Sequence, residues 1–449
     1  MKTEFLKYTG LTIVILLMVV DSGAEARPPL QTVLEEAAGK SHTLNIGRAE
    51  LDKAQFKRHM VYQTYLPNVE FNTSFRSLDE RIQFQADPVS FPLPGGNDLQ
   101  VQVPPVTLQD RNTFRANVEV TQVLFTGFKV PRLGRAARHG EQAAEWSMEA
   151  DKQELLKEVT EAYDKLALLD QSLKVIDRAD ERLEEEQRVA DQAYEEGLIP
   201  AFDLTRLRIA QRDLEKQRIG IEGKRELAAR NLEHLSGIGW EQFLEDTSEL
   251  SLIAIDPANL KPDNRPEIKA LEEAGRAADQ KYRAARSDYL PEVYAFFRQE
   301  LYEDDLSVLE PTRAMGVGLR WNVFDGFNRS RKVQKAERDR IIARERLEEV
   351  TSLSSLDQKQ AEVKFSVADQ QLRVSEETLK DARTSLRLSR ERYRLGLGPV
   401  SEQLEAETDY QKAELDWLEA VYDQRRAAID LLRASGTMSV DRIVMLEQN

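Results

Sequence analysis

The side chains of this chain that could do chemistry are mainly carboxylates and histidines, because the sequence contains no cysteine. Its acidic clusters, such as Glu184–Glu186, lie in polar segments typical of solvated helices, where Glu184 is spaced to pair with Arg188. Gly396-x-Gly398 is too short for a phosphate-binding loop. The four histidines are scattered without the spacing of metal ligands: His42, His59, His139 and His234. The sequence therefore predicts no catalytic residue, no metal site, no cofactor and no enzyme.

The elements around these side chains are duplicated. Tyr194–Pro200 returns as Tyr393–Pro399, and Leu124–Phe128 returns as Val323–Phe327, in both cases 199 positions later. Tyr65-Leu66-Pro67 returns as Tyr289-Leu290-Pro291 at a longer offset, so the first copy carries extra residues before Gly127. A period near 200 residues is too long for a solenoid and predicts a duplicated domain.

The N-terminus has the layout of a secretory signal peptide. Lys2 and Lys7 precede an apolar run from Leu11 to Val20, and Ala24-Glu25-Ala26 supplies a cleavage site before Arg27. Ten apolar residues are too few for a membrane-spanning helix, which needs roughly 20. The net charge of −16 disfavours nucleic acid and anionic lipid as partners.

Two long segments in each copy predict antiparallel helical hairpins. In the first copy a heptad series runs through Leu155, Ala162, Leu169, Ile176, Leu183 and Ala190. In the second copy, alanines recur every seven residues from Ala406 to Ala434, facing a series from Phe365 to Tyr393. A sustained 3.5-residue repeat predicts coiled-coil packing, although an amphipathic helix on an ordinary bundle is the alternative. We also expect one helix from Leu30 to Thr64, stacked end to end with a helix over 201–235 beside the long one.

Four segments alternate between apolar and polar residues, two in each copy. Val69, Phe71, Thr73 and Phe75 share one face of the first segment, and Met315, Val317, Leu319 and Trp321 share one face of the last. Such strands are typical of outer-membrane β-barrels, although hairpins packed on the helices would alternate in the same way. Four strands cannot close a barrel, so membrane strands would require several chains. The first pair is joined by a long loop, Ser77–Asn112, and the second turns near Glu303-Asp304-Asp305.

These features divide the chain as follows. Residues 1–26 are the signal peptide, and 27–235 are the first repeat, with a strand pair at 67–123 and a helical hairpin at 127–235. Residues 236–264 form an equatorial segment at the waist of the molecule. The second repeat covers 265–434, with a strand pair at 291–323 and a helical hairpin at 326–434, and 435–449 are a C-terminal tail.

The two Tyr-Leu-Pro motifs, the two strand-to-helix segments and the two tips, Tyr194-x-x-Gly197 and Tyr393-x-x-Gly396, resemble those of the TolC-like outer-membrane efflux proteins. The resemblance implies an α+β membrane protein, a homotrimer in which four strands per chain build a twelve-stranded barrel in outer-membrane lipid. Its helical hairpins would form an α-barrel across the periplasm. The implied function is an exit duct of a tripartite efflux or type I secretion system, working with a periplasmic adaptor and an inner-membrane pump of the RND, MFS or ABC type.

The resemblance also implies a periplasmic gate. The family's constriction matches Asp203 and Tyr393, but its arginine corresponds to Gly398, which puts the closing network in doubt. Its ring of acidic residues matches Glu402 and Glu405, which lie three apart and share a helix face. Such a ring would favour cations, whereas the alternative is that both carboxylates only complement the helix dipole.

The adaptor would dock on the tips, for which we expect Gly197, Leu198, Ile199, Pro200, Gly396, Leu397, Gly398 and Pro399. These residues also suit helix caps and turns, but turns do not need large apolar side chains. Two other classes of protein remain as alternatives: a periplasmic adaptor, which would have one hairpin between β-rich halves, and a non-transport coiled-coil scaffold. The cargo and the class of pump stay open, because selectivity lies mostly in the pump.

Overall fold

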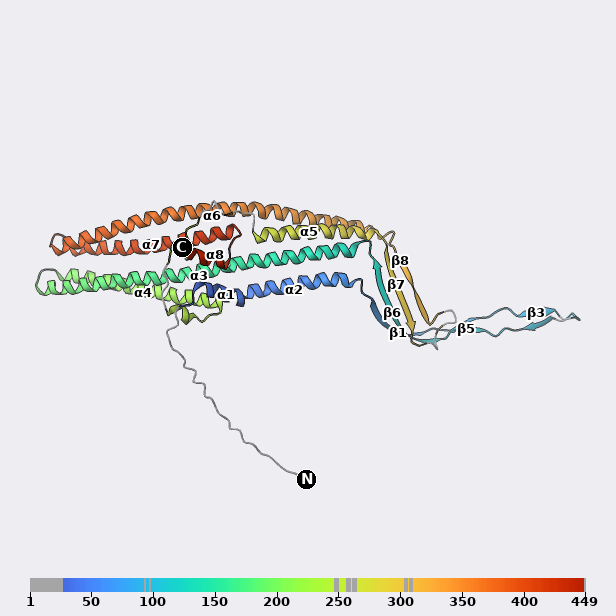
Figure 1. Cartoon of the computed structure of the whole chain (residues 1–449). Helices are drawn as coiled ribbons and strands as arrows, with labels where there is room; N and C mark the ends of the chain where they lie inside the picture. The colour runs from blue at the N-terminus through green and yellow to red at the C-terminus, as the bar shows by residue number, and fades with distance from the viewer. Residues whose placement is uncertain are drawn as a thin grey trace, which may run out of the picture.

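The computed structural model describes residues 27–92, 94–96, 98–245, 250–255, 260, 265–302, 306 and 310–447. The predicted signal peptide and the predicted turn at Glu303-Asp304-Asp305 lie outside these residues. The molecule is an elongated layer of helices with a sheet at one end (Figure 1). No helix in the described part of the chain is long and apolar enough to cross a membrane.

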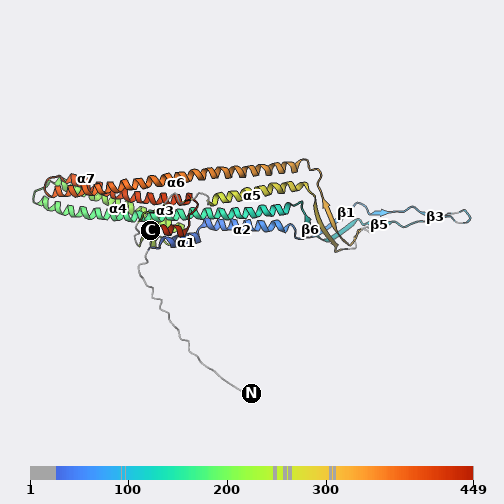
Figure 2. The same cartoon turned by 45° about the horizontal axis from the view of Figure 1, so that its top comes forward.

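Two helices of 67 residues run almost the whole length of the layer, α3 (Lys129–Glu195) and α6 (Asn328–Arg394). At 1.5 Å per residue each spans roughly 100 Å. From the end remote from the sheet, α4 (Ala201–Ser236) returns along α3 and α7 (Val400–Ala434) returns along α6. Towards the sheet, α2 (His42–Gln63) lies beside α3, and α5 (Pro266–Arg286) lies between α3 and α6 (Figures 1 and 2).

Heptad positions supply the contacts between these helices. All six residues of the series from Leu155 to Ala190 are buried. In the second copy, Ala406, Ala413, Ala427 and Ala434 are buried, as are Phe365, Leu372 and Leu386 of the facing series, while Ala420 and Leu379 are half-buried.

The single helix expected over Leu30–Thr64 is wrong. The chain forms α1 (Leu30–Lys40) and α2, which are separated at Ser41. Ser41 leaves the helical conformation and its hydroxyl accepts a hydrogen bond from the backbone N–H of Leu44, as an N-cap does. The break has a packing reason, because α1 buries Leu30, Val33, Leu34 and Ala37, whereas α2 buries only Leu44 and Gly47. The break lets α1 turn its apolar face into the core at the waist.

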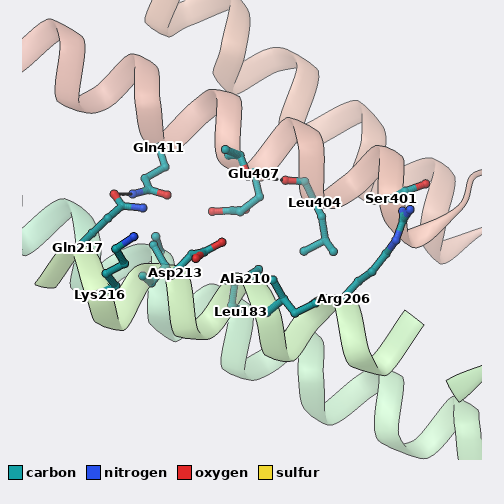
Figure 3. A pocket seen from close by; sticks show the side chains of 14 residues that line it. Leu183, Arg206, Ala210, Asp213, Lys216, Gln217, Ser401, Leu404, Glu407 and Gln411 are labelled. Atoms are coloured by element: carbon teal, nitrogen blue, oxygen red, sulfur yellow. Dashed lines mark hydrogen bonds between the residues drawn. The ribbon is translucent and has the colours of Figure 1, made fainter. Parts of the chain in front are cut away.

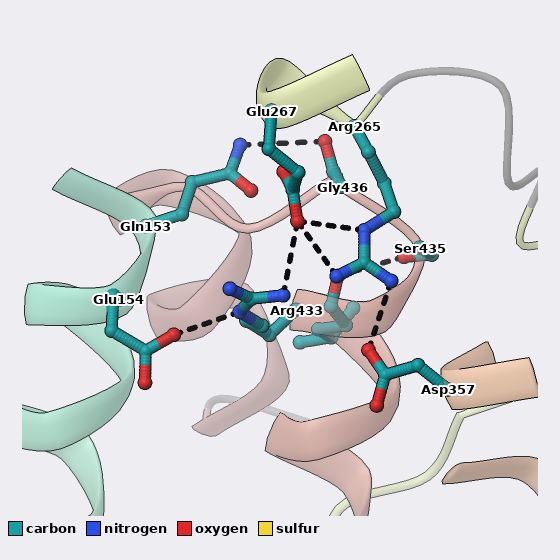
Figure 4. A network of polar contacts seen from close by, with 9 residues as sticks. Gln153, Glu154, Arg265, Glu267, Asp357, Arg433, Ser435 and Gly436 are labelled. Atoms are coloured by element: carbon teal, nitrogen blue, oxygen red, sulfur yellow. Dashed lines mark hydrogen bonds and ion pairs between the residues drawn. The ribbon is translucent and has the colours of Figure 1, made fainter. Parts of the chain in front are cut away.

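The waist holds much of the apolar core. There α1 packs near the short helical turn η1 (Trp240–Leu244) and α8 (Val440–Glu447), which forms within the predicted C-terminal tail. Phe243, Ile253 and Ile443 are almost fully buried in this core. Ion pairs close it on the side of α5: Arg265 bonds Glu267 at 2.7 Å and Asp357 at 2.8 Å, and Arg433 bonds Glu267 and Glu154 (Figure 4).

The sheet is antiparallel with the order β1-β6-β7-β8. Its strands are β1 (Asn68–Ser77), β6 (Asn112–Phe125), β7 (Glu292–Glu300) and β8 (Arg313–Arg320), and a short turn, η4 (Ser287–Tyr289), joins α5 to β7. One face exposes apolar side chains, among them Val69, Phe71, Met315, Val317 and Leu319. In β7, Tyr294 and Phe296 fall on the face that carries polar side chains in the neighbouring strands. They lie opposite Gly318 and Gly316, whose lack of a side chain leaves room for the rings.

The connection expected as a loop over Ser77–Asn112 contains strands instead. β2 (Ile82–Phe84) pairs with β5 (Val106–Gln109), and β3 (Val89–Pro92) pairs with β4 (Asp98–Val101). Cross-strand apolar pairs such as Phe91 with Leu99 favour this ribbon. It projects beyond the sheet, away from the helices (Figure 1).

Candidate gate and docking tip

The turns at the end remote from the sheet are built alike in both copies. Gly197 and Gly396 have φ of 74° and 71°, the left-handed conformation that glycine tolerates best at a helix end. The next backbone N–H reaches back in each case: that of Leu198 donates to the carbonyl of Ala193, and that of Leu397 to the carbonyl of Arg392, both at 2.8 Å. Pro200 and Pro399 then stand immediately before α4 and α7.

The predicted docking residues divide into exposed and packed side chains. Leu198 and Leu397 are 71% and 67% exposed, so each tip presents a leucine to solvent. Ile199 is half-buried against the apolar cluster that includes Leu204 and Val400. Exposed Leu395 and Phe202 lie close to these turns in sequence and were not among the expected docking residues. The apolar surface of the tips is thus larger than predicted.

The two expected constriction residues come from different hairpins and lie near each other. Tyr393 at the end of α6 is half-buried against the same apolar cluster. Burial raises the pKa of its phenol, and the carboxylates of Asp203 and Glu186 raise this pKa further. Neither Asp203 nor Tyr393 forms a side-chain hydrogen bond with any residue in the described part of the chain. The two side chains are thus near enough for the charge of Asp203 to disfavour ionisation of Tyr393, without a hydrogen bond between them.

The two expected ring carboxylates differ in their surroundings. Glu402 forms an ion pair with Arg392, at 3.2 Å from Nε, and Arg392 also donates to the carbonyl of Leu397. Glu405 is exposed, and no charged group of the described residues pairs with it. Of the two expected ring carboxylates, Glu405 is therefore the one whose charge no described residue of the same chain compensates.

Gly398 makes room for this ion pair. A Cβ atom at Gly398 would lie 3.2 Å from Oε2 of Glu402 and 3.6 Å from Cβ of Arg392. The tip therefore contains an arginine that bridges its turn, but the arginine comes from position 392, before the turn. Sequence reasoning missed Arg392 because the family's arginine position lies after the turn.

A buried carboxylate connects the two hairpins just above the tips. Glu407 of α7, 5% exposed at its side chain, accepts hydrogen bonds from Arg182 of α3 at 2.6 Å and from Arg390 of α6 at 2.9 Å. Arg390 also contacts Glu186 of α3 at 3.3 Å. Burial raises the pKa of the Glu186 carboxyl, which the guanidinium of Arg390 partly offsets. We call Glu407, Arg182, Arg390 and Glu186 the hairpin clasp.

The sequence carried a signal for the hairpin clasp that was missed. Glu407 occupies a seven-residue series with Val400, Glu414, Val421 and Ala428, in which all but the half-buried Glu414 are buried. A buried carboxylate in this seam requires a partner, because burying an isolated carboxylate is costly. The partner could not be identified from spacing, since Arg182 lies 225 positions away.

Beside the hairpin clasp the hairpins are loosely packed. A cavity of about 510 Å³ opens between α3, α4 and α7, lined on one side by Ala210 and Asp213 and on the other by Leu404 and Glu407 (Figure 3). One hydrogen bond crosses it, from the amide nitrogen of Gln411 to the amide oxygen of Gln217 at 2.9 Å. The hairpins are therefore joined here by a few polar contacts, with open volume between them.

No group of three or more His, Asp and Glu side chains that could hold a metal ion is found among the residues that the structure describes. The carboxylates near the tips, such as Glu402 and Glu407, instead form ion pairs with arginines of neighbouring helices.

Comparison with known proteins agrees with this architecture. The family model described as outer membrane efflux protein matches residues 33–238 and 260–437, which is most of the chain. The chain belongs to the outer membrane efflux protein family. This finding removes the two alternatives, a periplasmic adaptor and a coiled-coil scaffold. As a member of this family, the protein is a channel of the outer membrane that extends into the periplasm and serves as the exit duct of an efflux system.

Solved structures of outer-membrane channels share the fold. The outer-membrane channel OprN aligns with a TM-score of 0.74 at 20% identity, over 91% of this chain and 90% of its own. VceC of Vibrio cholerae aligns with a TM-score of 0.73 at 16% identity, over 91% and 96%. CmeC of Campylobacter jejuni aligns with a TM-score of 0.72 at 15% identity, over 94% and 89%. The comparison with curated protein sequences found no match.

Proposed function

We propose that three copies of this efflux protein close into one tube, with twelve strands in the outer membrane and the helices forming the wall of a periplasmic duct. The proposal rests on the two long edges of the single chain. Each edge runs through the sheet and the helices, and neither has a neighbour within the described residues.

The unpaired edges follow from the order of the elements. In the sheet, β1 and β8 each have one neighbour. In the helical layer, α6 forms one margin, where it contacts α5 and α7, and α2 and α4 form the other, where they contact α3. β1 follows α2 in the chain and β8 precedes α6, so each margin continues from sheet to helices. In lipid, each unpaired backbone group costs several kcal/mol, which drives the edge of β1 to pair with that of β8 in another copy.

Apolar side chains lie exposed at similar heights on the two helical margins. Ile219 of α4 lies roughly 27 Å from the tip-side end of its helix, and Val374 of α6 roughly 30 Å from its own, at 1.5 Å per residue. Nearer the sheet, α2 exposes Phe56 and Met60, and α6 exposes Ile342. Packing α6 of one copy against α2 and α4 of the next would bury both rows.

At the far end of the duct we propose that the tips dock onto a periplasmic adaptor and, through it, an inner-membrane pump. Support comes from the exposed Leu198 and Leu397 at the end of the molecule remote from the sheet. Asp203, Tyr393, Glu402 and Glu405 would line the constriction there, and the hairpin clasp would hold the two hairpins of one chain in the closed arrangement.

Cysteine cross-linking tests the closed tube, and the natural lack of cysteine keeps the experiment clean. We expect the double variant Ile219→Cys/Val374→Cys to give disulfide-linked dimers and trimers in membranes. Each single variant should stay monomeric on denaturing gels, because α4 of one copy faces α6 of the next.

The control is the pair Ile219→Cys/Ile342→Cys, whose positions lie at different heights. Ile342 lies about 48 Å from Val374 along α6, towards the sheet. If the matched pair gives no cross-link, or a ladder that continues beyond three chains, the trimeric tube is wrong.

A further inference from the structure

The end of the sheet nearest the helices carries a pair of stacked phenylalanines in each copy. Phe125 meets Phe128 edge to face at 5.2 Å between ring centroids, and Phe324 meets Phe327 at 5.6 Å. Phe128 and Phe327 have φ of 65° and 66°, a left-handed conformation that costs a bulky residue roughly 1–2 kcal/mol. Both rings remain exposed, by 56% and 69%. The same strained geometry in both copies holds aromatic rings at the surface.

Phe125 lies on the apolar face of the sheet. A register shift between Val123 and Phe125 turns Phe125 to the face of its partner Val293. That face of β7 also carries Ala295 and Phe297, which lie level with the exposed apolar side chains of β8. Phe125, with the exposed Phe128 that packs on it, therefore extends this apolar face towards the helices, and Phe324 and Phe327 form the corresponding pair after β8. Aromatic rings at this level are typical of the zone of lipid headgroups.

The helices that start immediately after these rings begin with basic residues. From Lys129 to Gly140, α3 carries lysine and arginine but no acidic residue, and the first eleven residues of α6 carry one acidic residue, Glu337. The whole chain has a net charge of −16, so this excess of positive charge is local. Basic side chains near a helix N-terminus oppose the helix dipole. The stability of the helices therefore does not account for them.

Part of this charge fastens the junction between sheet and helices. Lys129 pairs with Asp288 at 2.7 Å, Arg329 pairs with Asp325 at 3.0 Å, and Arg132 donates to the backbone of Arg283. Six further basic side chains are exposed, and no ion pair with any described residue compensates them. We name them the basic collar: Arg135, Arg138, Arg331, Lys332, Lys335 and Arg338.

We propose that the basic collar binds the headgroups of anionic phospholipids in the periplasmic leaflet of the outer membrane. Its residues begin within two turns of the exposed phenylalanines, and the last of them, Arg338, lies roughly 15 Å from the start of its helix. Long basic side chains reach from that depth towards a membrane surface, and attraction persists over about 8–10 Å in physiological salt. The surface is continuous with the apolar face of the sheet, so lipid is the neighbour that this position provides. The inference rests on the placement of the sheet in the membrane.

The test compares lipid selectivity between two charge-matched variants of the full chain. The collar variant is Arg331→Gln/Lys332→Gln/Lys335→Gln. The control is Arg383→Gln/Arg387→Gln/Arg394→Gln, which removes three exposed arginines without ion pairs from the opposite end of the same helix. Each protein is reconstituted in nanodiscs of mixed phosphatidylcholine and phosphatidylglycerol. Native mass spectrometry then counts the lipids that stay bound.

We expect the unmodified protein to retain phosphatidylglycerol over phosphatidylcholine, with a preference that falls as salt is raised. The collar variant should lose this preference by at least about fivefold, which is roughly the effect of one basic residue at an anionic surface. The control should keep it. Helical circular dichroism of the nanodisc samples, and flotation of the same proteins with liposomes, show that each variant folds and inserts.

Three results would overturn the proposal: no preference in the unmodified protein, an unchanged preference in the collar variant, or an equal loss in the control. If the collar variant keeps its preference for phosphatidylglycerol, an acidic protein segment would become the expected occupant of the basic collar. If the unmodified protein fails to insert, the membrane placement of the sheet is wrong as well. If it inserts without lipid preference, only the lipid inference fails.

Discussion

Glu407→Gln should loosen the two hairpins of each chain at the tip of the duct. The carboxylate of Glu407 holds Arg182 of one hairpin and Arg390 of the other, at 2.6 and 2.9 Å. Glutamine has nearly the same shape but no charge, so Arg182 would lose its carboxylate partner and Arg390 would keep only Glu186, at 3.3 Å. The remaining contact across the adjoining cavity is the Gln411–Gln217 hydrogen bond.

The burial of the hairpin clasp sets the size of the effect. Removing one partner of a fully buried ion pair costs about 3–5 kcal/mol. The side chains of Arg182 and Arg390 are 21% and 30% exposed, so water recovers part of this loss. We therefore expect a loss of about 2 kcal/mol in the free energy that joins the hairpins. If this energy favours only the closed arrangement, the closed-to-open ratio falls about 30-fold.

Single-channel recording in planar bilayers measures this ratio as the fraction of time spent in the high-conductance state. Thermal unfolding, followed by circular dichroism, reports the accompanying loss of stability. Glu414→Gln is the matched control. Glu414 lies seven residues further along the same seam and pairs at 3.3 Å with Arg178, whose side chain is 56% exposed. Its effect should stay below about 0.5 kcal/mol.

The triple variant Glu407→Gln/Arg182→Gln/Arg390→Gln should recover part of the stability, since it leaves no uncompensated guanidinium group. The reasoning is refuted if Glu407→Gln conducts and unfolds like the unmodified protein, or if Glu414→Gln has the same effect.

Three further predictions follow from the tips and the junction. Glu405→Gln should reduce cation selectivity and divalent block in single-channel recordings more than Glu402→Gln, because Arg392 already compensates Glu402. Leu198→Asp/Leu397→Asp should abolish export while leaving oligomerisation intact, since both leucines are exposed. Gly127→Ala should lower the free energy of unfolding by about 3 kcal/mol, because its Cβ would lie 2.6 Å from that of Leu290, whereas Gly326→Ala has open space and should cost about 1 kcal/mol.

Each of these has a result that would contradict it. Equal selectivity in the two glutamate variants would mean that the Arg392 ion pair does not screen Glu402. Normal export by the double leucine variant would remove the tips as the docking surface. Equal unfolding energies for the two glycine variants would show that the contact with Leu290 relaxes at little cost.

The residues that sequence patterns located well are those that repeat at a fixed interval. The heptad from Leu155 to Ala190 is buried throughout, and the turn glycines Gly197 and Gly396 have the expected left-handed conformation. The break at Ser41 was missed because the apolar pattern alone does not show that α1 must turn into the waist. The strands β2 to β5 were missed because a segment rich in proline and glycine also reads as a loop.

At the candidate gate, the sequence located the turns and the acidic residues but not their partners. The family resemblance assigned Asp203 and Tyr393 to one constriction, which stays a prediction, and in the structure the charge of Asp203 raises the pKa of Tyr393. The ion pair of Arg392 with Glu402 depends on the path of a tight turn and on the missing side chain of Gly398. Neither is encoded in residue spacing.

The sequence by itself determined the duplication, the long helices and the alternating strands, because a repeat of 3.5 or 2 residues is a local property of the backbone. Only the tertiary structure decided which charges meet. Arg182 reaches Glu407 across more than 200 positions because α3, α6 and α7 pack in one particular register. The same packing places β1 and β8, and α4 and α6, on opposite margins, where one chain leaves them without a neighbour.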